Sequence, residues 1–282
     1  MNDHFKMSQA SATTREYLAR VRGANIAEST TVEHLRSELA AKQATVDTLL
    51  KGFVSTDFPV VAGLAFDVLY RPAAAIEQLG GDWYDIFTLP DGRVAFSLGD
   101  VCGRGLGAAV KMGQAKQAIK VAASLQVNDP MPIAVLEQTN KVIFLNDHHV
   151  EFTTAIYGVI DTVTRKVTYA SAGHHPPILA TPGEQPRVMP NHGFPLGVEE
   201  NLPDLIREHE FSYEAGMLLV LYTDGLIEFS HDTNEGETRL LKAARAAVDT
   251  KAEHPAAFIV ESVLKEELQH PDDVAVMTIF FE

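Results

Sequence analysis

Residues 80–109 have the sequence GGDWYDIFTLPDGRVAFSLGDVCGRGLGAA. Within this stretch, apolar runs at Trp83–Leu89 and Arg93–Leu98 flank the turn signal Pro90-Asp91-Gly92, and the pattern predicts two strands joined as a hairpin. The Ala- and Lys-rich segment that follows, Gly105–Leu125, contains no proline and predicts a helix. An antiparallel hairpin that leads into a helix favours an α+β fold over a doubly wound parallel fold.

The rest of the chain extends this pattern, because strands occur in groups and helices in pairs. Leu64–Tyr70 alternates apolar and polar residues with period two, and Pro132–Asn146 carries apolar residues along one helical face. Two more helices are expected at about Glu237–Val248 and His254–Gln269. Further strands are predicted at 153–160, 167–172, 178–180, 206–211, 217–222 and 274–281. We therefore expect an α+β fold with largely antiparallel sheets.

The composition excludes some classes of function. The chain has 282 residues with 46% hydrophobic content, and 23 Lys and Arg against 38 Asp and Glu give a net charge of −15. Nucleic acid is not expected as a partner, because binding to a phosphate backbone relies on basic patches. A phosphorylated protein would meet the same repulsion unless metal ions reversed the local charge.

The N-terminal residues and the single cysteine indicate the compartment in which the protein is expected. Cys102 cannot form an intrachain disulfide, which fits a reducing compartment. The N-terminal residues lack the apolar core of a secretion signal, and no apolar run reaches the roughly 18 residues that a membrane span needs. A cytoplasmic protein that does not insert into a membrane is expected.

The N-terminal segment is expected to have a function separate from that of the rest of the chain. Residues 1–12 are polar and are expected to be disordered, whereas Thr13–Phe53 has a helical pattern. Heptad spacing relates Val32, Leu35, Leu39, Val46, Leu49 and Phe53. This apolar stripe can lie on the domain that follows, form a parallel coiled-coil homodimer, or receive an activator protein. We expect regulatory or dimerisation helices in residues 1–56 and one domain in residues 57–282.

Acidic residues recur at turns beside apolar strands. Asp82, Asp85 and Asp100 lie at glycine-flanked turns, Asp224 follows the apolar run 219–222, and the pair Asp272-Asp273 precedes the last strand. A single Asp-Gly after a strand is usually only a turn, but several that converge at one end of a sheet can hold hard divalent cations. The sequence therefore predicts a metal site.

Seven motifs occur in an order that is typical of one family. They are YRPA (70–73), GGDWYD (80–85), GDVCGRGLGAA (99–109), FTTAIYGVID (152–161), ASAGHHPP (170–177), YTDGLIE (222–228) and PDDVAVM (271–277). From about Leu64 to Glu282, the chain resembles the metal-dependent serine/threonine phosphatases of the type 2C (PPM) class. The resemblance is to the bacterial branch related to sporulation protein E and to stress-response phosphatases that regulate sigma factors. It implies a fold of two antiparallel sheets packed as a sandwich with helices outside.

The resemblance also implies a role for each acidic residue. Asp100 would bridge two Mn²⁺ or Mg²⁺ ions, with the Val101 carbonyl as a further ligand, while Asp82 would serve the second ion. Asp224 and Asp272 would complete the shell of the first ion. The two ions would lower the pKa of a shared water, which then attacks phosphorus without a covalent phosphoenzyme. The catalytic residues implied are thus Asp82, Asp100, Asp224 and Asp272.

Two acidic positions remain open at this level. Asp273 is a candidate metal residue, but it follows Asp272 directly, and neighbouring side chains on a strand point to opposite faces. Matching the motif without gaps favours Asp272 as the direct ligand. Asp85 would reach a third ion or support its turn.

Other residues near the motifs are weaker candidates for a catalytic or binding role. Cys102 lacks the arginine that cysteine phosphatases place after a five-residue gap, because Ala108 stands there. His174 and His175 can act as a general acid or support the sheet. Arg104 stands where many relatives have histidine, and it can contact substrate phosphate, contact a partner's carboxylate, or cover the loop. Arg71 is the nearest candidate for the phosphate-binding arginine of eukaryotic members.

These observations predict a hydrolase that acts on phosphoserine or phosphothreonine in a protein. By resemblance to its branch, the substrate would be a phosphorylated anti-anti-sigma factor of the STAS type in a bacterial signalling pathway. The N-terminal helices would then receive the signal and change how Gly105–Asn146 presents the metal loops. The alternatives are a catalytically inactive phosphatase-like binding module that recruits signalling partners, and a Ca²⁺-stabilised structural domain.

Overall fold

The computed structural model describes residues 16–17, 20–21, 32–38, 41, 57–72, 80–126, 131–146, 152–202, 206–229, 233–265 and 272–282. The chain divides into two units, Met1–Gly52 and Phe53–Glu282. In the first unit, residues 32–38 are helical and exposed, and His34 Nε2 lies 3.7 Å from Glu38 Oε1. The stripe positions Leu39, Val46, Leu49 and Phe53 lie outside the described residues, so the coiled coil stays a prediction.

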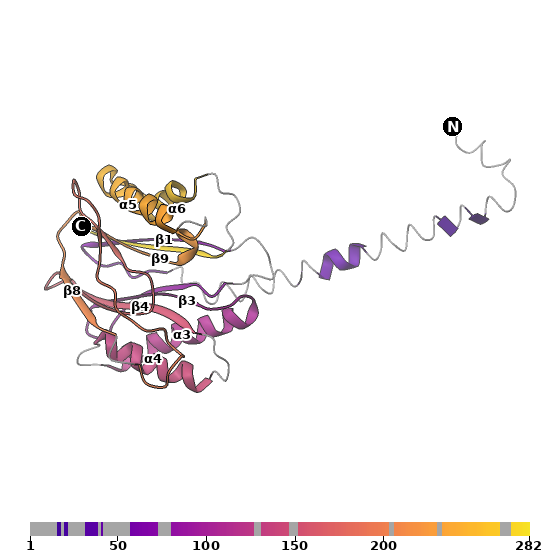
Figure 1. Cartoon of the computed structure of the whole chain (residues 1–282), viewed down its shortest axis with the longest axis horizontal. Helices are drawn as coiled ribbons and strands as arrows, with labels where there is room; N and C mark the ends of the chain where they lie inside the picture. Colours follow the sequence, from indigo (N-terminus) through magenta and orange to yellow (C-terminus); the bar gives the residue numbers. More distant parts are fainter. Residues whose placement is uncertain are drawn as a thin grey trace. The chain divides into compact units, whose positions relative to one another are not determined.

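The second unit contains two five-stranded sheets, in which every neighbouring pair of strands is antiparallel (Figure 1). One sheet, named here the β3 sheet, has the order β2 (Trp83–Thr88), β3 (Val94–Val101), β4 (Thr153–Asp161), β5 (Lys166–Ala172) and β8 (Glu208–Ser212). The other, the β9 sheet, has the order β1 (Leu64–Arg71), β10 (Val274–Phe281), β9 (Leu218–Tyr222), β6 (Ile178–Ala180) and β7 (Arg187–Val188).

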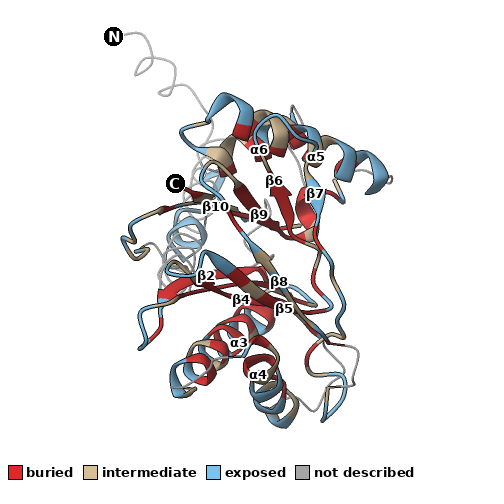
Figure 2. Ribbon diagram, turned by 90° about the vertical axis from the view of Figure 1, so that its left-hand side faces the viewer, coloured by how far each residue is buried: buried red, intermediate tan, exposed pale blue. Residues whose placement is uncertain are grey.

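Helices cover the outer faces of both sheets (Figure 2). Helices α3 (Leu106–Leu125) and α4 (Pro132–Asn146) pack on the β3 sheet, while α5 (Thr233–Thr250) and α6 (Pro255–Leu264) pack on the β9 sheet. A short 3₁₀ helix, η2 (Asp224–Leu226), follows β9 after the single residue Thr223. The predicted fold of two antiparallel sheets with helices outside is confirmed.

The core between the sheets explains the period-two pattern of the sequence. Tyr84, Phe96 and Ile156 point inward from the β3 sheet and meet Leu219 and Met277 of the β9 sheet, and all of them are buried. Alternate residues of the same strands face the helices instead, because successive side chains on a strand point to opposite faces. Each such buried side chain contributes about 1.5–3 kcal/mol, so this layer holds the two sheets together.

Most element boundaries match the predictions, and the differences have local causes. The predicted hairpin is present. Asp91 stabilises its turn, as predicted, because its Oδ1 accepts a hydrogen bond from the Arg93 amide at 3.0 Å. Helix α5 begins at Thr233 rather than near Glu237, since its first turns are polar and carry little periodic signal. Strand β3 continues to Val101, so Asp100 lies in a strand and not in the turn after it.

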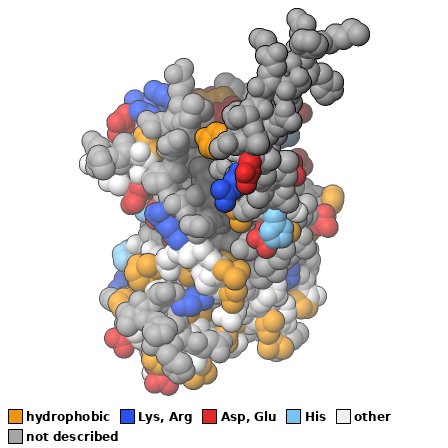
Figure 3. All heavy atoms as spheres, turned by 90° about the vertical axis from the view of Figure 1, so that its right-hand side faces the viewer, with side chains coloured by type: hydrophobic (Ala, Val, Ile, Leu, Met, Phe, Trp, Pro, Cys, Tyr) orange, Lys and Arg blue, Asp and Glu red, His pale blue; other side chains and the backbone are white. Residues whose placement is uncertain are grey.

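The outer helices leave some apolar side chains in solvent. Figure 3 shows hydrophobic side chains at the surface over the lower part of one face of the molecule. Exposed apolar residues of α3 and α4 include Leu106, Val110, Val121, Leu125 and Leu145. None of the helices in the described part of the chain combines the length and hydrophobicity that a membrane span requires.

Candidate functional site

The two sheets bring four predicted aspartates to one place. In the β3 sheet, the pairing of Trp83 with Gly99 sets Asp82, just before β2, beside Asp100 near the end of β3. In the β9 sheet, Asp224 lies two residues after the end of β9, and Asp272 lies two residues before β10, the strand paired with β9. Residues more than a hundred positions apart therefore meet at the same edge of the sandwich.

A pocket of about 290 Å³ lies between these strand ends. Its lining includes three of the four aspartates together with Val101, Cys102, Arg104 and His175. The imidazole of His175 stacks on Tyr222, with ring centroids 5.6 Å apart and an interplanar angle of 25°. The pocket is small and polar, which suits a charged group such as a phosphoryl group rather than an apolar ligand.

Asp82 lies behind the pocket and is held by a hydroxyl group. Its side chain is 3% exposed, and the fully buried Thr223 donates a hydrogen bond from Oγ1 to Asp82 Oδ2 at 2.6 Å. Thr223 Oγ1 in turn accepts a hydrogen bond from the Ala275 amide at 2.9 Å. Burial raises the pKa of Asp82 well above its usual range, Asp100 raises it further, and the Thr223 hydroxyl opposes them.

Burial and neighbouring carboxylates also raise the pKa values of Asp100 and Asp224. Burial, followed by the nearby carboxylates of Asp224 and Asp272, raises the pKa of Asp100 to about 7. Burial and then the Asp272 carboxylate also raise the pKa of Asp224. Because ionised carboxylates this close repel one another, a cation placed among them would favour their charged forms.

The residues fit divalent metal ions in chemistry, but their side chains are not arranged as a finished site. Carboxylate and carbonyl oxygens are the donors that Mg²⁺ and Mn²⁺ prefer. Among the described residues, no three His, Cys, Asp or Glu side chains stand close enough to hold one ion as they are. Asp100 instead shares a hydrogen bond with Asp82. Metal binding requires some of these side chains to reorient.

Backbone geometry keeps the predicted carbonyl ligand within reach. The Val101 amide donates a hydrogen bond to the Gly81 carbonyl at 3.2 Å. A Cβ atom at position 81 would lie 2.2 Å from the Val101 carbonyl oxygen and 2.9 Å from Asp100 Oδ1. A side chain at Gly81 would therefore fill the space beside both predicted donors, which explains the second glycine of the GGDWYD motif.

The structure separates the two neighbouring aspartates before β10. Asp272 lines the pocket, and its side chain is 47% exposed. Asp273 is 1% exposed, and its Oδ2 accepts a hydrogen bond from the Tyr70 hydroxyl at 2.9 Å. Burial, with Asp273 as the next cause, raises the pKa of Tyr70, so the phenol stays protonated and remains a donor. This placement favours Asp272 as the direct ligand, while Asp273 is held by Tyr70 and supports Asp272 through its own backbone amide.

Asp85 lies away from the pocket. It is the third residue of β2, is 2% exposed, and its Oδ2 lies 3.4 Å from Lys120 Nζ of α3. This carboxylate therefore connects the strand after Asp82 to the helix after the Asp100 loop. The ion pair favours the supporting role for Asp85 over contact with a third ion.

The histidine and cysteine candidates also have defined surroundings. Thr154 Oγ1 and His174 Nδ1 are hydrogen-bonded at 2.9 Å. Burial, followed by the neighbouring His175, lowers the pKa of His174 to about 3, so its ring is neutral near pH 7. The neutral ring and the hydrogen bond with Thr154 favour a supporting role for His174 over that of a general acid. Cys102 is partly exposed at the pocket wall and is a free cysteine.

Two residues of the site were not predicted from the sequence. Thr223 stood within the YTDGLIE motif and Tyr70 within YRPA, but neither was assigned a role. Both hold a buried aspartate through a hydroxyl group, with hydrogen bonds to Asp82 and Asp273. The available signal was the position of each hydroxyl residue at the end of a strand beside the acidic motifs.

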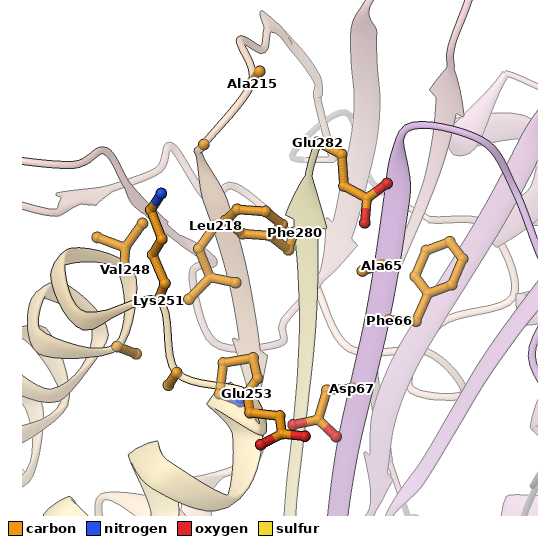
Figure 4. Close-up of a pocket in the computed structure, with 14 residues that line it drawn as sticks. Ala65, Phe66, Asp67, Ala215, Leu218, Val248, Lys251, Glu253, Phe280 and Glu282 are labelled. Atoms are coloured by element: carbon orange, nitrogen blue, oxygen red, sulfur yellow. The ribbon is translucent and has the colours of Figure 1, made fainter.

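A larger cavity, of about 550 Å³, lies at the opposite end of the β9 sheet (Figure 4). Its lining includes Leu218, the first residue of β9, and Phe280, near the end of β10. The carboxylate of Asp67 in this cavity accepts a hydrogen bond from the Ala256 amide at 2.9 Å and so caps α6. No predicted site residue is among the residues that line this cavity, so the candidate site is the smaller pocket.

Comparison with known proteins identifies relatives of this chain. Protein IcfG of Synechocystis sp. is 26% identical over 245 residues, which cover 77% of this chain and 37% of IcfG. Phosphoserine phosphatase RsbU of Bacillus subtilis is 24% identical over 255 residues, which cover 89% of this chain and 73% of RsbU. The chain thus spans little more than a third of the first relative.

Solved structures and a family description agree with the fold. The crystal structure of the RsbU and RsbW domains of a Mycobacterium tuberculosis protein has a TM-score of 0.70 and 25% sequence identity, and the match covers 81% of this chain and 63% of that chain. The family described as stage II sporulation protein E (SpoIIE) matches residues 90–282. Since this match covers more than half of the chain and includes the loops that carry Asp100, Asp224 and Asp272, the protein belongs to the SpoIIE family, as its motifs predicted.

Proposed function

We propose that this protein is a Mn²⁺- or Mg²⁺-dependent protein phosphatase that hydrolyses phosphoserine or phosphothreonine. The observation that carries the proposal is the convergence of Asp100, Asp224 and Asp272 from two sheets on one small pocket, with Asp82 directly behind them. The neighbouring carboxylates raise the pKa of Asp100, and such crowded carboxylates are unfavourable in their ionised forms unless cations neutralise them. The names of relatives such as phosphoserine phosphatase RsbU support the same reaction class.

The metal ions would be held by the carboxylates of Asp82, Asp100, Asp224 and Asp272 and by the carbonyl of Val101. When bound, two such ions would supply Lewis acidity that activates water and neutralises charge on the phosphoryl group. Asp273 would support Asp272 from behind, because its amide donates a hydrogen bond to Asp272 Oδ1 at 2.9 Å.

The chain's own residues prepare the site for this reaction. The Thr223 hydroxyl favours the ionised form of Asp82, the form that a metal ligand needs. The stack of His175 on Tyr222 fixes the imidazole at the pocket wall. His174 stays neutral and adds no positive charge near the ligands. These contacts orient the acidic groups before the substrate arrives, which lowers the cost of arranging them during the reaction.

The substrate that we propose is a phosphorylated anti-anti-sigma factor of the STAS type. A phosphorylated protein would be repelled by the charge of −15 unless the site held cations, so metal loading and substrate binding belong together. We also propose that residues 1–56 receive the regulatory input, as homodimer contacts or as the binding site of an activator protein.

The experiment that tests this function incubates the full chain with purified phosphorylated STAS proteins from its own genome, with and without Mn²⁺. Metal-dependent release of phosphate is expected from the parent protein, and Asp100→Asn and Asp224→Asn should abolish it. Asp91→Asn is the matched control, because Asp91 stabilises the turn at the far end of the hairpin.

Each other outcome identifies a different function. Binding of the phosphoprotein without turnover would indicate a catalytically inactive binding module. Stabilisation by Ca²⁺ alone would indicate a structural domain. Activity that survives Asp100→Asn would make the assigned carboxylates wrong. If removal of residues 1–56 changed neither the oligomeric state nor activation, the regulatory role of that segment would be wrong.

A further inference from the structure

Arg104 occupies an unusual position in the loop between β3 and α3. Gly103 and Gly105 flank it with φ angles of +114° and +82°, a backbone region that glycine enters at little cost. The side chain of Arg104 is 52% exposed, and its Nη2 lies 3.7 Å from Oδ2 of Asp272. A guanidinium on a glycine-flanked, exposed loop can reorient without disturbing the packed core.

The charge of the pocket makes this arginine distinctive. Three carboxylates line the pocket, and Arg104 is the only Arg or Lys among the described residues that line it. Its present partner, Asp272, is a proposed metal ligand. The contact is also weak, because ion pairs between half-exposed side chains contribute little, and 3.7 Å is longer than a good charged hydrogen bond.

We propose that Arg104 is the phosphate-binding residue of this site, and that its guanidinium exchanges the carboxylate of Asp272 for the phosphoryl group of the substrate. This inference rests on the proposed phosphatase function. A guanidinium binds phosphate oxygens through two parallel hydrogen bonds, which are shorter and stronger than the 3.7 Å contact of Arg104 Nη2 with Asp272 Oδ2. The exchange therefore replaces a weak contact by a stronger one.

The exchange has a thermodynamic consequence. Arg104 can neutralise Asp272 or bind phosphate, but one guanidinium cannot fully serve both. Phosphate binding therefore frees the Asp272 carboxylate for a cation, and a cation on Asp272 frees Arg104 for phosphate. By linkage, each ligand raises the affinity of the other by the same factor. Arg104 would thus make metal binding and substrate binding cooperative.

Calorimetric titration tests this coupling without turnover. Mn²⁺ is titrated into the full-length protein with and without inorganic phosphate as the probe. Parent protein should bind Mn²⁺ more tightly when phosphate is present. Arg104→Gln should bind Mn²⁺ up to about fivefold more tightly in the absence of phosphate, since it loses a weak competing ion pair, and should show a smaller gain on adding phosphate. Arg187→Gln removes the same charge from exposed strand β7, outside the pocket lining, and should behave like the parent protein.

Steady-state kinetics provides the second measurement. For a phosphoserine peptide, Arg104→Gln should raise KM and the inhibition constant of inorganic phosphate about tenfold or more, because a charged hydrogen-bonding partner of phosphate is lost. Arg104→Lys keeps the charge without the paired donors and should fall between Arg104→Gln and the parent protein. A thermal melt of each variant shows whether it is folded.

The outcomes separate this inference from the function on which it rests. If the parent protein hydrolyses the peptide while Arg104→Gln keeps its KM, its phosphate inhibition and its phosphate–Mn²⁺ coupling, the inference is wrong and the phosphatase function stands. If the parent protein neither binds Mn²⁺ nor hydrolyses phosphoserine, the proposed function itself is wrong.

Discussion

Asp100→Asn should stabilise the metal-free protein at alkaline pH. In the folded protein, burial and the neighbouring carboxylates raise the pKa of Asp100 from 3.8 to about 7. Between these two pH values the folded state binds a proton that the unfolded state has released, so stability falls as pH rises through that window. The raised pKa corresponds to about 4 kcal/mol once the carboxyl is ionised. Asparagine cannot ionise, so the variant avoids this cost.

The measurement is a series of thermal melts in EDTA from pH 4 to pH 8. Because Asp82 and Asp100 titrate together, we expect about 2–4 kcal/mol of stabilisation at pH 8, and little difference at pH 4. For a unit of this size, that gain corresponds to an increase in Tm of about 4 °C or more. Addition of Mn²⁺ should stabilise the parent protein and not the variant, since metal binding uses the ionised carboxylate.

Asp91→Asn is a control for which the expected change in stability has the opposite sign. Burial acts to raise the pKa of Asp91, but hydrogen bonds from Arg93 outweigh it and lower the pKa. A lowered pKa contributes stability above the unfolded value, so Asp91→Asn should be slightly less stable than the parent at pH 8. If Asp100→Asn were less stable than the parent protein at pH 8 without metal, or if its effect did not change with pH, the inference that ionised Asp100 destabilises the folded protein would be wrong.

Three further substitutions test the contacts around the site. Thr223→Val should weaken Mn²⁺ binding about tenfold in calorimetry, because the hydroxyl that favours ionised Asp82 is lost, whereas Thr223→Ser should bind normally. Tyr70→Phe should lower stability in urea unfolding by about 1–3 kcal/mol, because buried Asp273 loses a donor; unchanged stability would contradict the role of that hydrogen bond. Lys120→Met should destabilise the protein by about 1–3 kcal/mol in urea unfolding, since its buried aspartate partner on β2 loses a cation; unchanged stability would contradict the role of that ion pair.

The sequence was sufficient to predict the sheets and the main helices. The period-two alternation at Leu64–Tyr70 and the Pro90-Asp91-Gly92 turn have local causes, so they could be recognised without the tertiary structure. The order of the acidic motifs then indicated which aspartates converge. Asp85 was left open, although its alternation with Trp83 and Phe87 places it on the face that packs against α3.

The hydroxyl partners of the aspartates could not be predicted in the same way. Thr223 reaches Asp82 across 141 positions of sequence, and Tyr70 reaches Asp273 across 203. Such contacts depend on how the two sheets are stacked, and a single sequence carries no periodic signal for that stacking. The ion pair of Arg104 with Asp272 likewise depends on the conformation of a loop between two glycines.

Because the carboxylates come in pairs from separate sheets, catalytic competence would report on the assembly of the whole sandwich. A collapsed folding intermediate with both sheets formed but loosely stacked would have every acidic residue in its local place and still lack a site. In a genetic screen, a cavity-forming change such as Phe96→Ala or Met277→Ala, buried between the sheets and outside the pocket lining, would then be scored as a metal-binding defect. Excess Mn²⁺ would rescue such alleles by mass action, whereas it would not rescue alleles that remove an aspartate.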